Sequence, residues 1–168
     1  MSEAKFELRA VVDDDGFVAL VCPDTYSGYV DEDWTLDQVL ATFVEQMNAG
    51  ALFSVYPGPD LADASLRISD TPSTVAARRE VSGLVRVGEG GIWLTEYAQL
   101  TMAAQSRDTA PYAAHHVRLP VPSGVYRVTL RQMASSYEDE VETAVELVIR
   151  RSNTGAICPR FDAVPWFE

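Results

Sequence analysis

Carboxylates are the side chains of this chain that are best placed to do chemistry, and many of them are gathered in short turns. Three acidic turns stand out, at residues 13–15, 31–33 and 138–140. Paired carboxylates can act as general acid and base, clusters can hold a metal ion, and exposed arrays bind cationic partners. Tyr26 and Tyr29 precede the second turn, and tyrosine is favoured at interfaces, although such rings also pack beneath loops.

The first acidic turn has an Asp-x-Asp-Gly pattern, which is also found in calcium sites. An EF-hand loop needs glycine at its sixth position and glutamate at its twelfth. Counting from Asp13 places Val18 and Asp24 at those positions, and placing Gly16 sixth puts Val11 at the first ligand position. The pattern therefore predicts a turn and not a metal site.

Other residue types that carry catalysis are few. His115 and His116 are adjacent, so on a strand they would face opposite sides and could not easily share a metal ion. Cys22 and Cys158 are far apart in sequence and are expected to be reduced, partly buried thiols. No nucleophile elbow, phosphate-binding loop or zinc-type cysteine spacing occurs in the sequence. We therefore predict a non-enzymatic protein without a cofactor, with an enzyme of unrecognised type as the alternative.

The net charge of the 168 residues is −12, and it is unevenly distributed. Residues 1–70 hold 14 Asp and Glu against 3 Lys and Arg, which gives −11, whereas residues 71–168 hold 11 against 10, which gives −1. Such a field repels nucleic acid and favours a basic protein partner, although an acidic surface also serves solubility alone. The residues expected to bind such a partner are Asp13, Asp14, Asp15, Tyr26, Tyr29, Asp31, Glu32, Asp33, Glu138, Asp139 and Glu140.

One helix is clearly predicted, over about residues 35–49. Its apolar stripe at helical spacing consists of Leu36, Val39, Leu40, Phe43, Val44 and Met47. Thr35 and Gln38 can form a capping box, and Trp34 can pack on Val39 as a hydrophobic staple. Gly50 is suited to end the helix. The helix dipole favours acids near its start, so part of the acidic excess has a structural reason.

The other apolar segments have the alternation or the β-branched composition of strands. They are residues 5–12, 17–22, 51–56, 61–69, 84–87, 125–131 and 141–151. We expect the first two to form a hairpin, Gly-rich residues 88–91 to turn another, and residues 74–80 to form one or two helical turns. Arg86, Arg127 and Arg131 should each lie on one face of their strands, and the aromatic tail should dock on the domain. These elements predict a single domain over residues 1–168, a mainly β, antiparallel β-sandwich with one principal amphipathic helix.

The sequence excludes a wholly disordered protein and a membrane-spanning one. Hydrophobic residues make up 47% of the chain, which excludes disorder of the whole. No apolar run approaches the roughly 20 residues of a membrane span, and the N-terminus lacks the pattern of a signal peptide. We therefore expect a cytoplasmic protein with no membrane partner.

The stretch from Val81 to Met133 resembles a known family. Its order is Val-x-Val, a turn, Gly-Ile, an apolar run, a spacer, Leu-Pro, and Gly-x-Tyr before a strand. The matching residues are Val85, Val87, Gly91, Ile92, Leu119, Pro120, Gly124 and Tyr126, and upstream residues 33–35 and 48–53 fit as well. Over about half of its length the chain thus resembles the competence protein J family, small bacterial inhibitors of a DNA-entry nuclease.

The resemblance implies a protein that occludes the cationic substrate groove of a nuclease. A related alternative is an immunity protein against another bacterial toxin. The alternative from a different class is a small-molecule or carbohydrate-binding β-sandwich. A deep pocket lined with aromatic residues would favour that alternative, whereas a flat or convex acidic face would favour the inhibitor.

Overall fold

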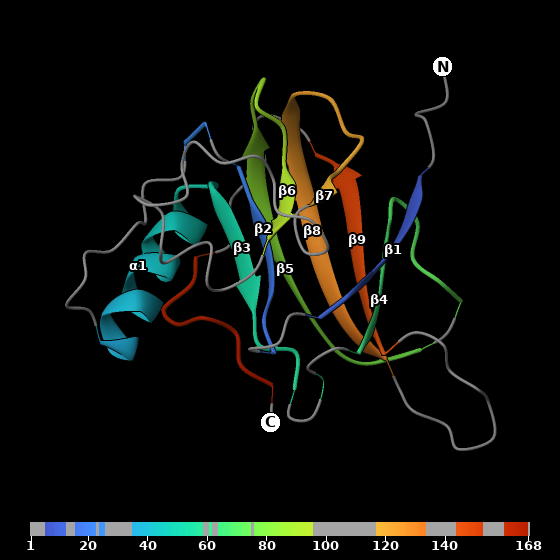
Figure 1. The fold of residues 1–168 in the computed structure, drawn as a ribbon, viewed down its shortest axis with the longest axis horizontal. Helices are drawn as coiled ribbons and strands as arrows, with labels where there is room; N and C mark the ends of the chain where they lie inside the picture. The colour runs from blue at the N-terminus through green and yellow to red at the C-terminus, as the bar shows by residue number, and fades with distance from the viewer. Residues whose placement is uncertain are drawn as a thin grey trace.

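Two β-sheets and one helix form the part of the chain that the computed structural model describes, which is residues 6–12, 16–22, 24–25, 35–58, 61, 64–74, 76–95, 117–133, 144–152 and 160–167. The sheets pack face to face, and the helix lies beside β3, away from β1 and β4 (Figure 1). The elements are β1 (Glu7–Val11), β2 (Val18–Val21), α1 (Leu36–Asn48), β3 (Leu52–Val55), β4 (Ser65–Ser69), β5 (Ala77–Val87), β6 (Trp93–Thr95), β7 (Val117–Arg118), β8 (Gly124–Met133) and β9 (Val145–Arg151). The predicted mainly β fold with one principal helix is confirmed.

The pairing of the strands is mostly antiparallel. A five-stranded sheet has the order β1-β4-β9-β8-β5, and a four-stranded sheet has the order β3-β2-β6-β7. The exception is β4 with β9, which are parallel. A parallel pair needs a long crossover, and here the chain from β5 to β8 supplies it. The predicted antiparallel β-sandwich is thus confirmed, with this one parallel pair in its larger sheet.

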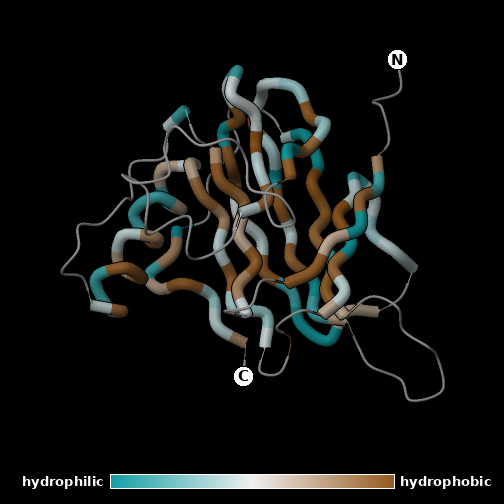
Figure 2. The backbone as a smooth tube through the Cα atoms, in the orientation of Figure 1, coloured by the Kyte–Doolittle hydropathy of each residue, from teal (hydrophilic) through white to brown (hydrophobic). Residues whose placement is uncertain are grey.

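The core lies between the two sheets. Alternate residues of the five-stranded sheet point inward and are fully buried, as Leu66 and Ile68 of β4 and Val128 and Leu130 of β8 show. All four residues of β2 are buried, and so are all four of β3 at the edge of the same sheet, so both faces of these strands are covered. In Figure 2 the strands accordingly carry long hydrophobic stretches. Each such side chain contributes at most about 1.5–3 kcal/mol to folding.

The helix α1 forms as its sequence predicts. The Oγ1 of Thr35 accepts from Gln38 N–H at 3.2 Å, and Oε1 of Gln38 accepts from Thr35 N–H at 2.8 Å, which completes the capping box. Val39, Phe43 and Met47 are buried, and the helix packs against β3 and β5. The stripe is shorter than predicted, because Leu36 is 50% exposed at the first turn. Among the described residues there is no helix with the length and apolarity needed to cross a membrane.

Both predicted hairpins are wrong, because the turns connect strands of different sheets. β1 pairs with β4 in one sheet, whereas β2 pairs with β3 and β6 in the other. Residues 88–91 likewise lead from β5 in the five-stranded sheet to β6 in the four-stranded sheet. The helical turns expected at residues 74–80 are also wrong, since β5 begins at Ala77 and pairs along β8.

The aromatic tail docks on the sandwich, as predicted, within its described residues 160–167. Trp166 forms a parallel bridge with Tyr56, and their rings stack at 4.2 Å between centroids. Phe17 meets Trp166 edge to face at 5.6 Å. Asn48 at the end of α1 exchanges two hydrogen bonds with the backbone of Phe161. The tail therefore joins the helix to the edge of β3.

Candidate functional site

The residues that we predicted to bind a partner lie outside the described residues, and their role stays a prediction. They are Asp13, Asp14, Asp15, Tyr26, Tyr29, Asp31, Glu32, Asp33, Glu138, Asp139 and Glu140. The same holds for His115, His116, Cys158 and the Trp34 staple. The structure does describe their sequence neighbours Gly16, Asp24 and Thr35.

Asp24 is held by the glycine-rich turn at residues 88–91. Its Oδ2 accepts from the N–H of Gly90 at 2.6 Å. A Cβ added at Gly88 or Gly90 would lie 2.6 or 2.5 Å from the Asp24 carboxylate oxygens, so a side chain at either position would push this carboxylate away. The turn therefore binds the Asp24 carboxylate and leaves room for it, a role that our hairpin prediction missed. The signal in the sequence is the alternation of Gly88 and Gly90.

Cys22 is a buried free thiol two residues before Asp24. Burial, together with the negative charge of Asp24, raises the pKa of this thiol to about 12. Since the thiolate is the nucleophile and the metal ligand, Cys22 stays protonated and inert near neutral pH. This agrees with the expectation that it is a reduced, buried side chain.

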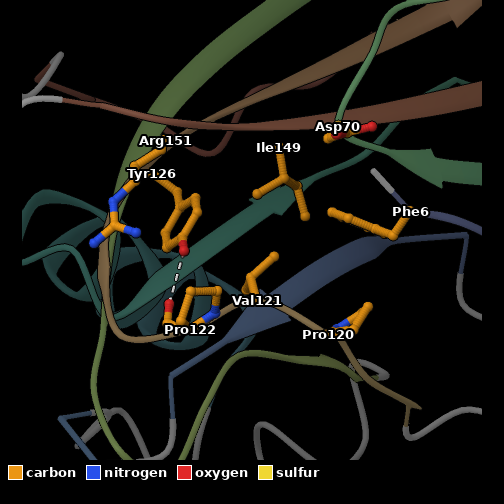
Figure 3. A pocket seen from close by; sticks show the side chains of 8 residues that line it. All are labelled: Phe6, Asp70, Pro120, Val121, Pro122, Tyr126, Ile149 and Arg151. Atoms are coloured by element: carbon orange, nitrogen blue, oxygen red, sulfur yellow. Dashed lines mark hydrogen bonds between the residues drawn. The ribbon is translucent and has the colours of Figure 1, made fainter. Parts of the chain in front are cut away.

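A cavity of about 230 Å³ opens at the end of the sandwich where β4 and β9 end and β8 begins (Figure 3). The residues that line it are Phe6, Asp70, Pro120, Val121, Pro122, Tyr126, Ile149 and Arg151. The Tyr126 hydroxyl donates to the Pro122 carbonyl at 2.7 Å, and Arg151 and Asp70 lie toward opposite sides of the cavity. Typical ligand pockets measure roughly 300–1,000 Å³, so this cavity suits only a small ligand.

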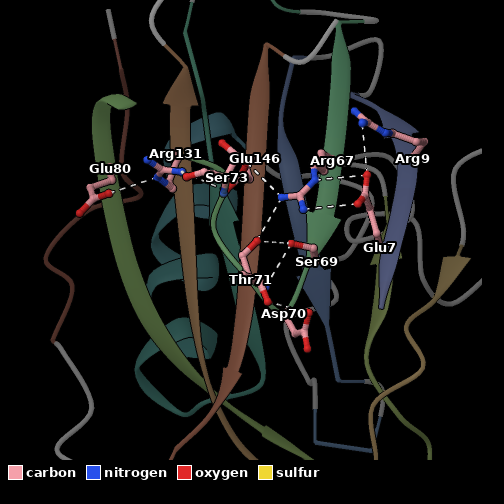
Figure 4. A network of polar contacts seen from close by, with 10 residues as sticks. All are labelled: Glu7, Arg9, Arg67, Ser69, Asp70, Thr71, Ser73, Glu80, Arg131 and Glu146. Atoms are coloured by element: carbon pink, nitrogen blue, oxygen red, sulfur yellow. Dashed lines mark hydrogen bonds and ion pairs between the residues drawn. The ribbon is translucent and has the colours of Figure 1, made fainter. Parts of the chain in front are cut away.

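A network of charges crosses the outer face of the five-stranded sheet (Figure 4). At its centre lies Glu146 of β9, whose side chain is 1% exposed. Its carboxylate accepts from Arg131 at 3.0 Å and from Ser73 N–H at 2.9 Å, and it lies 3.2 Å from Arg67. Arg67 also contacts Glu7 at 3.3 Å, and Arg131 contacts Glu80 at 3.5 Å. The network thus joins all five strands.

The environment of Glu146 favours its charged form. Burial raises the pKa of the carboxyl, but donation from Ser73 and the two contributions of Arg131, its hydrogen bond and its charge, outweigh burial and hold the pKa below its ordinary value. The strand predicted over residues 141–151 contains Glu146, but its sequence does not predict that this side chain is buried, because the partners come from β4, β8 and the segment after β4. Arg9 adds a third arginine through its contact with Glu7 at 3.2 Å, so the three glutamates and three arginines of the network cancel and its function is structural.

Positive charge is concentrated in the strands of the larger sheet. The five strands of the larger sheet contain nine arginines and three glutamates, which leaves +6. With a net charge of −12, the rest of the chain therefore carries −18. The helix α1 contributes Asp37 and Glu45 to this remainder and contains no lysine or arginine. The protein thus has a cationic sheet and an acidic remainder.

Comparison with known proteins defines the fold and goes no further. No protein-family model and no curated protein matches this chain. The solved structure of crocagin biosynthetic gene J is similar with a TM-score of 0.52 at 14% identity, covering 89% of this chain and 97% of that one. ComJ from Bacillus subtilis, an inhibitor of the DNA-degrading activity of NucA, is similar with a TM-score of 0.47 at 14% identity, covering 90% and 96%. The expected resemblance to the competence protein J family is confirmed as a weak one, which concerns the fold alone.

The residues that carry the family resemblance explain why it concerns the fold. Four of them lie where the chain passes between the sheets, namely Gly91 and Ile92 after β5 and Leu119 and Pro120 before β8, and the others lie in β5 and β8 themselves. The two crossings are joined by the N–H of Leu119, which donates to the carbonyl of Ile92 at 2.9 Å, and both side chains are buried. Gly91 and Gly124 have φ of 79° and 155°, values that favour glycine. These residues fix the sandwich and leave the identity of a partner open.

Proposed function

We propose that this chain is a non-enzymatic, acidic binding protein of the bacterial cytoplasm that blocks the cationic active-site groove of a nuclease, as an inhibitor or an immunity protein. The observation that carries the proposal is the separation of charge, with +6 on the larger sheet and −18 elsewhere. Because most arginines lie in the larger sheet, the carboxylates outside it can interact with a basic protein. The motif resemblance to a family of nuclease inhibitors supports the same class of partner.

The acidic loops supply the recognition in this proposal. Nucleases hold phosphate groups with lysine and arginine, so carboxylates can compete for the same groove. In the sequence, Asp31, Glu32 and Asp33 precede α1 and follow Asp24, whose carboxylate accepts a hydrogen bond from Gly90. Charges of this kind steer association, while desolvated tyrosines such as Tyr26 and Tyr29 would supply affinity.

The direct test is inhibition of DNA cleavage. Proteins captured by this chain from its source cell are identified, and each captured nuclease is purified. Its digestion of plasmid DNA is then followed with increasing amounts of this protein. We expect cleavage to stop at a stoichiometric ratio. Full cleavage by every captured nuclease in the presence of excess protein would contradict the proposal.

A matched pair of variants distinguishes the acidic loop from net charge. Asp31→Asn with Glu32→Gln removes two charges from the proposed site. Glu45→Gln with Asp162→Asn removes two charges from exposed positions elsewhere. We expect the first variant to inhibit more weakly and the second to inhibit like the wild type. Equal loss in both would mean that only the total charge matters.

The cavity beside Tyr126 favours a second candidate, a small-molecule-binding sandwich. Its walls are mostly apolar, and Arg151 and Asp70 supply two opposite charges for orientation. A ligand seated there would stabilise the fold, so a thermal-shift screen of small carboxylates and sugars tests this candidate. No upward shift for any compound that fits about 230 Å³ would leave the inhibitor as the better account.

A further inference from the structure

Two arginines face each other on the outer side of the five-stranded sheet. Arg127 of β8 and Arg150 of β9 are directly opposite in the strand register, and both are exposed. Residues opposite each other in an antiparallel pair have Cβ atoms about 4.5–5.5 Å apart, so the two guanidinium groups can reach one point. In the part of the chain that the structure describes, neither arginine has an ion-pair partner.

The other end of the same sheet face shows that this chain can neutralise its arginines. There Arg67 and Arg131 are each shared between two glutamates, at 3.0–3.5 Å. Like charges directly opposite on neighbouring strands destabilise a sheet. An acidic chain with 25 Asp and Glu nevertheless keeps Arg127 and Arg150 opposite each other.

The aliphatic parts of the two arginine side chains can cover apolar residues of the sheet, but this role does not require a positive charge. Leu84 is opposite Arg127, Val125 precedes it on the same face, and they are only 4% and 9% exposed. Aliphatic arginine stems are suited to cover such residues. A methionine would cover them equally well without repulsion. The positive charges at these two positions therefore indicate a binding site for an anion.

We propose that Arg127 and Arg150 form a binding site for a compact phosphate group, such as that of a small phosphate monoester. Two planar guanidinium forks match the oxygens of a doubly charged phosphate. Compactness follows from the remaining charge of −18 on the rest of the chain. Fields are screened beyond about 8 Å in physiological salt, so a small anion is attracted by the arginines, whereas a long polyanion would also meet the acidic remainder.

Inorganic phosphate is the probe that tests this site. The melting temperature is measured in phosphate and in sodium chloride of equal ionic strength, for the wild type and for Arg127→Met with Arg150→Met. Phosphate also stabilises proteins by exclusion from their surface, and the variant reports that general effect. The matched control is Arg78→Met with Arg160→Met, which removes two other exposed arginines. We expect a saturable increase of about 3 °C or more over the general effect in the wild type and the control, and none in the Arg127 and Arg150 variant.

Arg150→Glu separates binding from stability. The glutamate would pair with Arg127, so we expect a higher melting temperature than the wild type in low salt and no specific response to phosphate. The same response to phosphate in all variants would overturn the proposal. Tighter binding of a single-stranded oligonucleotide of about 20 residues than of phosphate, lost in the Arg127 and Arg150 variant, would overturn the compact ligand in favour of a nucleic acid.

Discussion

Glu146 is the central residue of the ion-pair network on the five-stranded sheet. Its carboxylate is buried between Arg67 and Arg131, which are themselves 15% and 12% exposed. Removing one partner of a buried ion pair is costly because it leaves the other charge without compensation. Removing the charge of Glu146 should therefore cost much more stability than removing the charge of an exposed ion pair on the same face.

Glu146→Gln keeps the shape of the side chain and removes its charge. We expect the free energy of unfolding to fall by about 3 kcal/mol or more, measured by urea denaturation. Glu80→Gln is the matched control, because Glu80 pairs with the same Arg131 but is 62% exposed. It should cost less than about 1 kcal/mol. Equal losses in the two variants would show that Glu146 is not a special centre.

The pH dependence of stability should carry the signature of Glu146. Its pKa is lower in the folded protein than its ordinary value of 4.5, so its stabilising contribution is present above that value. The contribution is lost as the pH falls through the lower, folded pKa. We expect the wild type to lose more stability than Glu146→Gln between pH 5 and the acid end of the titration, by denaturant midpoints at each pH. Parallel profiles would exclude Glu146 as a source of acid sensitivity.

At the scale of elements, the helix was predictable because its determinants are local. The capping box, the apolar stripe and Gly50 lie within sixteen residues of sequence, and the structure places all of them as expected except Leu36. The hairpins were not predictable, since a turn sequence specifies a reversal and not the sheet that the next strand joins. The continuous apolar run in β2 was the available signal, because it indicates a strand covered on both faces, unlike the half-exposed β1.

The helix offers a matched test of which residues hold it. Phe43 is 1% exposed and Leu36 is 50% exposed on the same stripe. Phe43→Ala should lower the free energy of unfolding by about 3–5 kcal/mol, whereas Leu36→Ala should cost under about 1 kcal/mol. Denaturant unfolding of both variants measures the difference. A small loss for Phe43→Ala would mean that the helix is not anchored to β3 through its stripe.

At the scale of the whole molecule, the tail is part of the folded unit. Its Trp166 stacks on Tyr56, and Val164 is 6% exposed. Ending the chain after Arg151 should lower the melting temperature by several degrees, because burial of one large aromatic contributes roughly 1.5–3 kcal/mol. Calorimetry of the full and shortened chains measures this. An unchanged melting curve would show that the docked tail adds nothing to stability.

The sequence predicted the charge imbalance of the whole molecule, and the structure adds where the cations lie. The arginines are spread over the sequence from Arg9 to Arg160, and only the strand order brings nine of them into one sheet. The cavity and the Arg127–Arg150 pair were unpredictable for the same reason. The acidic partner-binding residues remain predictions from sequence.

The measurement that bears most directly on the central claim is the association rate of this protein with its nuclease at several salt concentrations. Replacing Asp31, Glu32 and Asp33 by Asn, Gln and Asn should slow association by about tenfold in low salt and flatten its salt dependence, with a smaller effect on dissociation. Because these acids precede α1, the melting temperature of the variant must be shown to match the wild type. Association of the folded variant at the wild-type rate in low salt would contradict the account.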